Sequence, residues 1–222
     1  MKGASETILR VRGQGPCLQL WLAGATAPVI TLDLTVCLEH GRKFLPYDGR
    51  ELLRRAGTDG ACVCFPGEEM AGLRFTYADL QSLVFGDPLA VSEKVFAFAD
   101  QADRSRLDPL LLLRVDGFPG EPGRTSRLET AWAEGERLVF RVGNPVRPVV
   151  SLGLARALEG TGVWDALSPE QLLGEVRCGK TWVTLLPETT PVVLTWSDLY
   201  SLTFQGDRGR AARKILSAVG RG

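Results

Sequence analysis

The sequence has little of what catalytic and metal sites most often use. Its 222 residues include a single histidine, His40, and no Ser, Cys or carboxylate side chain stands at a spacing that would pair with it. A surface or capping histidine fits better than a catalytic base, so we expect no enzymatic activity. Five cysteines, an odd number without regular spacing, make no disulfide framework and fit a reducing compartment.

An excess of charge of one sign is also missing. The 26 lysines and arginines balance the 26 aspartates and glutamates, so any attraction to nucleic acid must come from local basic groups. No apolar run is long enough to span a bilayer, and the segment containing Lys2, Ser5 and Glu6 lacks the apolar core of a secretory signal. We therefore expect a cytoplasmic protein that does not enter membranes.

What the sequence does contain is one stretch written twice. Residues 76–85 (TYADLQSLVF) reappear as residues 195–204 (TWSDLYSLTF), and Pro148 follows Pro28 by 120 residues. So long a period indicates duplication of a domain rather than a solenoid array. We predict an α+β fold made of two tandem copies, residues 1–102 and 103–222, related by a pseudo-twofold axis. Each copy is a small module with short β-hairpins and several short helices.

The first part of each copy is predicted to be a hairpin followed by a short helix. Residues 8–11 and 18–22 read as the hairpin, and residues 110–115 as the corresponding first strand of the second copy. Over residues 31–39 a period-two strand competes with a helix. We choose the helix, because the counterpart at residues 151–160 is rich in good helix formers and ends in glycine.

The later part of each copy carries helix-start signals. Ser168, Pro169 and Gln171 form a capping box with proline at the first helical position, and a matching helix starts near Asp48. Thr76 and Thr195 are predicted N-caps of the repeated helix, each with an aspartate three residues on. The strands before these helices are predicted at residues 61–65 with 73–75, and at residues 181–186 with 192–194.

A closing helix ends each copy. Residues 210–219 place apolar side chains on one side and Arg210, Arg213 and Lys214 on the other, which predicts a basic amphipathic helix. Residues 89–98 form the corresponding helix of the first copy, where only Lys94 is basic.

One nucleotide-binding pattern occurs. Residues 174–181 (GEVRCGKT) match the phosphate loop, which works only where a strand enters the loop and a helix leaves it. Here a helix precedes the match and a strand follows it, so we expect a helix C-cap and a turn. An ATP-using enzyme based on Lys180 is the alternative reading.

Four soft ligands suggest zinc, but the internal comparison argues against it. Cys37 and His40 with Cys62 and Cys64 have ligand-like spacing. When the copies are aligned on the prolines that follow, Cys62 and Cys64 correspond to Val183 and Leu185, on the inward side of a strand. Cys37 corresponds to Ala157 and His40 to Gly160. Buried cysteine commonly acts as a small hydrophobe, so we expect no metal and no cofactor.

Aromatic and basic side chains are the remaining candidates for binding. Tyr77, Trp196 and Tyr200 at the repeated helices either stack on bases or pack against the sheet, and packing is the commoner use. Two groups of cations are candidate phosphate contacts, with a solvated basic face as the alternative. They are Arg42, Lys43, Arg50, Arg54 and Arg55 in the first copy, and Arg208, Arg210, Arg213 and Lys214 in the second.

The order of elements resembles the BRO-N domain of viral Bro proteins and phage antirepressors. Residues 149–160 (VVSLGLARALEG) are similar to the family's strand leading into "DVCRALG", and residues 198–204 (DLYSLTF) to "GLYxLIF", with Ala211 and Lys214 in the helix that follows. Residues 80–85 match more loosely. The helix pair is also similar to the N-terminal part of DdrC-type DNA-damage-response proteins. The resemblance implies binding to DNA or to a repressor protein, whereas the neutral charge and the duplication depart from the family.

We therefore expect a non-enzymatic DNA-binding protein with two duplicated modules and a regulatory or DNA-damage role. The alternative is a protein-interaction module, an antirepressor or scaffold, that does not bind nucleic acid directly. The sequence does not decide whether the ligand is duplex or single-stranded nucleic acid. It also does not decide whether the protein is a monomer or a homodimer.

Overall fold

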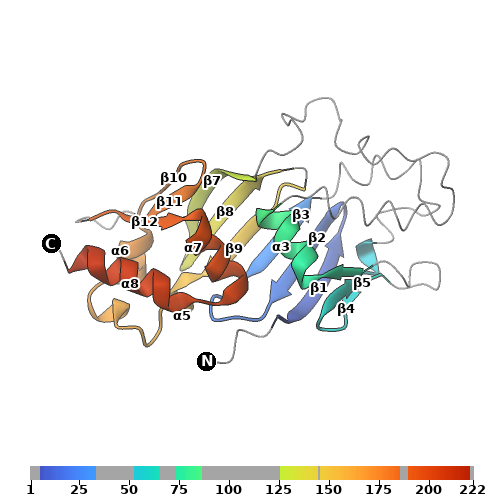
Figure 1. Ribbon diagram of the computed structural model, residues 1–222, viewed down its shortest axis with the longest axis horizontal. Helices are drawn as coiled ribbons and strands as arrows, with labels where there is room; N and C mark the ends of the chain where they lie inside the picture. The colour runs from blue at the N-terminus through green and yellow to red at the C-terminus, as the bar shows by residue number, and fades with distance from the viewer. Residues whose placement is uncertain are drawn as a thin grey trace.

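A six-stranded antiparallel β-sheet lies at the centre of the molecule (Figure 1). The computed structural model describes residues 6–33, 53–65, 74–86, 126–144, 146–185 and 190–220. In spatial order the strands are β1 (Ile8–Gln14), β2 (Cys17–Leu22), β3 (Val29–Asp33), β9 (Val149–Gly153), β8 (Arg137–Gly143) and β7 (Arg127–Glu134). Helices pack on this sheet, so the predicted α+β class is confirmed.

Each edge of the large sheet is a hairpin with a two-residue loop. Gly15 in the loop between β1 and β2 has φ 58°, and Gly135 in the loop between β7 and β8 has φ 56°. A positive φ suits glycine because other residues there suffer a clash of their Cβ with the backbone. Both hairpins also have an irregularity in register, after Ile8 in one and after Leu128 in the other. The hairpin predicted at residues 8–22 is confirmed.

The centre of the sheet joins the first part of the chain to the second. The register of β3 and β9 places Val29 opposite Ser151, Ile30 opposite Val150 and Thr31 opposite Val149. Two backbone hydrogen bonds flank this junction, from Asp33 N to Val146 O (2.8 Å) and from Gly153 N to Thr26 O (2.7 Å). Adding 120 to each residue number of the first part, and subtracting 120 from each of the second, converts the Ile30–Val150 pair into itself. The same operation exchanges the other two strand pairs with each other, and the two hydrogen bonds with each other. The pairing at the centre is therefore internally symmetric.

A small three-stranded sheet lies near each end of the large one (Figure 1). One consists of β4 (Gly57–Thr58), β5 (Cys62–Cys64) and β6 (Arg74–Thr76), and the other of β10 (Val176–Cys178), β11 (Trp182–Leu185) and β12 (Val192–Thr195). Ile8 N donates to Gly60 O at 2.7 Å, and Leu128 N donates to Lys180 O at 2.9 Å, which ties each small sheet to its adjacent hairpin. The strands predicted in these regions are confirmed.

The repeated stretch forms a capped helix at each occurrence. These helices are α3 (Tyr77–Phe85) and α7 (Trp196–Tyr200), the latter continued by the π-helical turn η4 (Ser201–Gln205). Thr76 and Asp79 make a reciprocal capping box before α3, and Thr195 and Asp198 make one before α7. Both predicted N-caps are confirmed. In Figure 1, α3 and α7 lie side by side in front of the large sheet.

Leu53 and Arg54 are also helical, and the remaining described helices belong to the second part of the chain. They are α5 (Leu154–Ala157), the short 3₁₀ turn η3 (Val163–Asp165), α6 (Pro169–Leu173) and α8 (Arg208–Val219). The capping box predicted at Ser168 precedes α6, with Pro169 at its first position. Helix α8 buries Ala211, Ala212 and Ile215, as its predicted apolar side requires. Within the described segments no helix is long and apolar enough to cross a membrane.

Two predicted helices are wrong over part of their length. Thr31 and Asp33 belong to β3, so no helix begins at residue 31. In the second copy β9 continues to Gly153, and the helix covers only Leu154–Ala157. The reason is tertiary: β3 and β9 complete each other's hydrogen bonds at the centre of the sheet, which outweighs local helix propensity.

Another correction concerns strand equivalence. The strand that opens the second hairpin is β7, whereas the sequence predicts this strand at residues 110–115, which lie outside the described residues. The proline-based alignment of the cysteines is also displaced by one residue. Val63 is fully buried like Val183, while Cys62 and Cys64 are half-buried on the other side of β5. A slip of one residue exchanges the two faces of a strand.

Several predictions fall on residues that the structure does not describe. They include the boundary at residue 102, the helix at residues 89–98, the helix start near Asp48, the pair Cys37 and His40, and the cations Arg42, Lys43 and Arg50.

Candidate nucleic-acid interface

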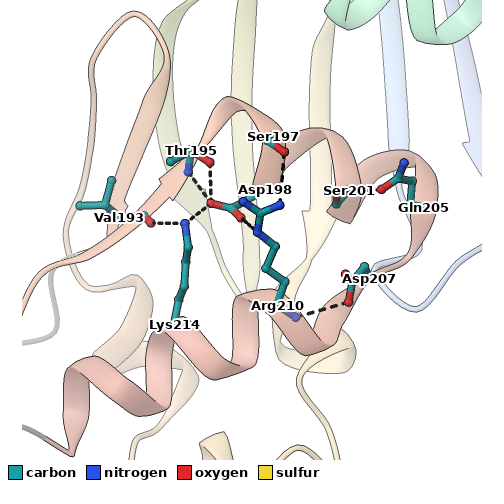
Figure 2. Close-up of polar contacts among 9 residues, drawn as sticks. All are labelled: Val193, Thr195, Ser197, Asp198, Ser201, Gln205, Asp207, Arg210 and Lys214. Atoms are coloured by element: carbon teal, nitrogen blue, oxygen red, sulfur yellow. Dashed lines mark hydrogen bonds and ion pairs between the residues drawn. The ribbon is translucent and has the colours of Figure 1, made fainter.

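Two of the four cations predicted on the last helix, Arg210 and Lys214, converge on one buried carboxylate (Figure 2). The Asp198 side chain is 1% exposed and lies at the start of α7. Lys214 Nζ donates to Asp198 Oδ2 and also reaches Val193 O at 3.4 Å. Arg210 Nε lies 2.7 Å from Oδ1 as an ion pair, although among the described residues Oδ1 accepts no hydrogen bond. The two cations thus hold α8 against α7.

The capping interactions of Asp198 complete its surroundings. The backbone N–H and the hydroxyl of Thr195 both donate to Oδ2, each at 2.7 Å. Burial raises the pKa of Asp198, but hydrogen bonds from Lys214 and Thr195 to its ionised form outweigh burial, so the pKa is lowered. Asp198 is therefore an ionised structural anchor, and Arg210 and Lys214 are largely occupied by it.

The other predicted cations do not gather into one surface. Arg208 is directed to the carbonyl oxygens of Ala157 (3.5 Å) and Glu159 (3.3 Å). Arg213 is exposed on the outer side of α8. Arg54 and Arg55 are exposed and already engaged in interactions within the chain. They precede β4, which lies near the end of the molecule opposite to α8 (Figure 1).

The phosphate-loop match has the wrong geometry for a nucleotide. Helix α6 precedes it, β10 occupies its middle, and Lys180 lies in the turn that leads into β11. No helix follows whose N-terminal amides would face a phosphate. Gly179 has a packing reason of its own, because a Cβ there would lie 2.4 Å from the Trp182 ring. The match is a helix end and a hairpin turn, as the order of elements predicts.

The aromatic residues of the repeated helices pack against each other. Tyr77 and Phe204 meet edge to face at 5.4 Å between centroids, and Phe85 and Trp196 meet in the same way at 4.9 Å. Tyr77 is buried, which removes it as a base-stacking group. A shallow groove of about 400 Å³ remains between α3 and α7, lined in part by Phe85, Trp196 and Tyr200.

Metal ligands do not cluster in the described part of the chain, where no group of three His, Cys, Asp or Glu side chains could hold an ion. Cys17, Cys62, Cys64 and Cys178 are free thiols, all half-buried.

The side of the large sheet turned away from α3 and α7 carries a different set of residues. We call this side the open face. Because residues alternate between faces, β2 buries Leu18, Leu20 and Leu22 towards the helices and turns Gln19 and Trp21 to the open face. In the described segments, α3 and α7 lie on the opposite side of the sheet (Figure 1).

Two neighbouring rows of side chains cross the open face. The strand registers align the first, which we call the tryptophan row: Arg10, Trp21, Val29, Ser151, Val139 and Trp132. Two residues along each strand lies the second, which we call the arginine row: Arg12, Gln19, Thr31, Val149, Arg141 and Thr130. Each row takes one residue from every strand of the sheet, so both rows span its full width.

The two rows are positively charged and carry no acidic residue. Arg12 and Arg141 are exposed, and neither makes a hydrogen bond or ion pair within the described part of the chain. Arg10 lies over the Trp21 ring, with Cζ 4.9 Å from the ring centroid, a cation–π contact that fixes the indole. Three carboxylates of this face lie beside the rows: Asp33 follows the arginine row, Glu129 lies against Gly143, two residues beyond Arg141 on β8, and Glu134 precedes the tryptophan row.

Arg137, at the margin of the open face, is structural. Its Nε donates to Ser151 Oγ at 2.7 Å, and its terminal nitrogen donates to the carbonyl oxygens of Ala27 and Ser151. It binds the hairpin of β7 and β8 to the turn before β3. Arg12 and Arg141, unlike Arg137, make no hydrogen bond or ion pair among the described residues.

Sequence reasoning missed the open face, although a signal for it exists. Arg10 and Arg12 alternate with Val11, and Gln19 and Trp21 alternate with Leu20, which is the period of a half-exposed strand. These runs are short, and the sequence does not predict β7. The sequence therefore shows neither which side of the sheet these residues occupy nor which strand lies next to Arg141.

Comparisons with protein-family models, with curated proteins and with solved structures find no match to this chain.

Proposed function

We propose that this chain is a non-enzymatic nucleic-acid-binding protein that acts through the open face of its large sheet. The observation that carries the proposal is a pair of exposed arginines, Arg12 and Arg141, that make no hydrogen bond or ion pair among the described residues and lie beside a row that contains two tryptophans. Guanidinium groups neutralise phosphates, and indole rings stack on bases, so this combination is suited to nucleic acid.

The proposal moves the contact surface away from helix α8. Arg208, Arg210 and Lys214 have internal partners, and withdrawing Lys214 would leave the buried Asp198 charge with less compensation. Arg213 is the cation of α8 that remains available among the residues described. It adds to the positive potential of the molecule without being part of the open face.

We also propose that the chain is a tandem duplication with pseudo-twofold symmetry, with modules at residues 1–102 and 103–222. Support comes from features that recur at an offset of 120, including the glycine turns, the register irregularities and the contacts between β3 and β9. Ala27 and Arg147, also 120 apart, both have unusual positive φ, at 39° and 38°. In this arrangement the two modules share one sheet, and α3 and α7 meet near the axis.

The resemblance to BRO-N domains and to DdrC-type proteins points to the same class of function. We infer a regulatory or DNA-damage-related role in the cytoplasm, where the four described cysteines would remain reduced thiols. A homodimer would carry two open faces, each made of the same residues.

Fluorescence anisotropy of labelled single-stranded and duplex DNA, titrated with the full chain, tests the proposal. We expect binding at low salt that weakens steeply as salt is added, since phosphate contacts release counterions. Absence of binding to single strand, duplex and RNA at low salt would overturn the function. In that case a pull-down that keeps a protein partner after nuclease treatment would establish the alternative, an interaction module such as an antirepressor.

A further inference from the structure

We infer that the ligand of the open face is a single-stranded nucleic acid, laid across the strands with its bases on the tryptophan row and its phosphates on the arginine row. This inference rests on the proposed function and specifies its substrate class. It depends on how the two rows are separated from each other.

The tryptophans lie in one row because of the internal offset. Trp21 stands 120 residues before Arg141, and Arg12 stands 120 residues before Trp132. Trp21 and Arg12 of the first half thus stand at exchanged positions relative to Trp132 and Arg141 of the second. The symmetric pairing of β3 with β9 converts one row into the other, so this exchange collects both indoles in one row and the guanidinium groups of Arg12 and Arg141 in the next.

The dimensions suit an extended strand. Four strand spacings separate Trp21 on β2 from Trp132 on β7, which is roughly 19 Å. The arginine row runs two residues away along the strands, roughly 7 Å from the tryptophan row. A single strand has its bases on one side of its backbone, so bases and phosphates can occupy two parallel lines of this kind.

A duplex fits this surface less well. Its bases are stacked on each other and present only their edges in the grooves, so an indole ring on a sheet cannot stack on them. The centre of the tryptophan row, Val29, Ser151 and Val139, has no charged residue of its own. Arg137 donates to Ser151 there and Val139 is only 2% exposed, so the two indoles are the surfaces of this row on which bases would stack. Glu134, beyond the tryptophan row, would repel phosphates there, which favours the arginine row for the backbone.

The test compares variants of both rows with matched controls. The probes are labelled oligothymidine and oligouridine of about 12 nucleotides, within the site sizes of sheet-based single-strand binders, and a duplex of equal length. We expect Trp21→Leu and Trp132→Leu each to weaken binding of the single strand roughly 5- to 150-fold, the loss of one stacked base. Trp21→Phe and Trp132→Phe should retain much of the affinity.

The arginine row has its own readout. Arg12→Gln and Arg141→Gln should each weaken binding and each lower the salt slope by roughly 0.7, the loss of one phosphate contact on a single strand. The controls are Trp182→Leu and Arg177→Gln, exposed residues of the small sheet formed by β10, β11 and β12. These should bind as the unaltered chain does.

A second measurement keeps the test valid where a leucine variant does not fold. Stacking on a base quenches indole emission, so a single strand should quench the fluorescence of the unaltered chain and quench the Trp21→Phe/Trp132→Phe double variant much less. The three other tryptophans of the five in the chain remain in that variant as an internal reference.

The outcomes separate the two proposals. Binding that is unaffected by changes in both rows, or a duplex bound more tightly than either single strand, overturns the inference but leaves nucleic-acid binding intact. Binding of no probe overturns both. A preference between oligothymidine and oligouridine decides whether the natural ligand is DNA or RNA, and either preference supports the single-strand assignment.

Discussion

The hydroxyl of Tyr77 donates a hydrogen bond of 3.1 Å to the carbonyl oxygen of Phe204, between the two occurrences of the repeated helix. The same two residues pack edge to face, and Phe85 packs in the same way on Trp196. Because Phe85 and Phe204 close the two matching stretches and Tyr77 and Trp196 begin their helices, the contact is reciprocal. The two copies of the repeated stretch therefore pack against each other.

Tyr77→Phe should destabilise the fold by about 1 kcal/mol at neutral pH, because one hydrogen bond is lost and little volume changes. It should also alter the alkaline limb of stability. Burial raises the pKa of Tyr77 to about 12, from an ordinary value of 10.0. The unfolded chain thus ionises first, and the contribution of Tyr77 is present below pH 10 and lost as pH rises towards 12.

Urea denaturation of both proteins at pH 7 and above pH 10 measures this effect. The difference in unfolding free energy should shrink, then reverse, as pH rises. Tyr200→Phe is the control, since in the described residues its hydroxyl makes no hydrogen bond while its ring packs on Phe85. A Tyr77→Phe variant with the same pH dependence as the unaltered chain would contradict the assignment.

Local signals in the sequence predicted local structure well. The N-caps at Thr76 and Thr195 and the capping box at Ser168 depend on residues three positions apart, and all three form as predicted. The amphipathic pattern of α8 likewise predicted which side of the helix is buried. Such features are decided by short-range hydrogen bonds and by one periodicity, which a sequence displays directly.

Features that depend on distant pairing did not follow from the sequence. The local pattern predicts a helix at Thr31, because nothing in the nearby sequence shows that β3 pairs with β9, more than a hundred residues away. The cations of α8 read as a free basic face, because Asp198 is a capping residue in the sequence and its role as their counterion appears only when α7 packs on α8. The open face needs six strands in register, and β7 was missing from the prediction.

Asp198→Asn should cost about 1 to 3 kcal/mol at neutral pH, since a buried ionised acceptor for Lys214 and Thr195 becomes neutral. The pKa of Asp198 is lowered in the folded state, so its contribution is present above the ordinary value of 3.8 and is lost as pH falls through the folded pKa below that value. The two proteins should therefore differ at pH 5 to 7 and converge in acid.

Chemical denaturation across this pH range provides the measurement. Glu175→Gln is the control, because Glu175 forms an exposed ion pair with Arg177 and surface pairs contribute little. A constant difference between Asp198→Asn and the unaltered chain down to pH 3 would show that Asp198 stabilises α8 by packing alone.

Gly15 and Gly135 give the sharpest test of the internal symmetry. Both have φ near 57°, at 58° and 56°, and a Cβ added at either would meet no atom within 4 Å. Alanine should therefore cost backbone strain alone, about 1 to 2 kcal/mol at each site. Gly57→Ala is the control, since a Cβ there also meets nothing within 4 Å and its φ is not positive. It should be neutral or slightly stabilising, because alanine restricts the unfolded chain.

If the two hairpins occupy equivalent places in one cooperative sheet, the two costs should be equal and should add in the double variant, since the turns lie at opposite edges. Unequal costs, with one hairpin indifferent to alanine, would mean that the two edges of the sheet do not share one folding unit.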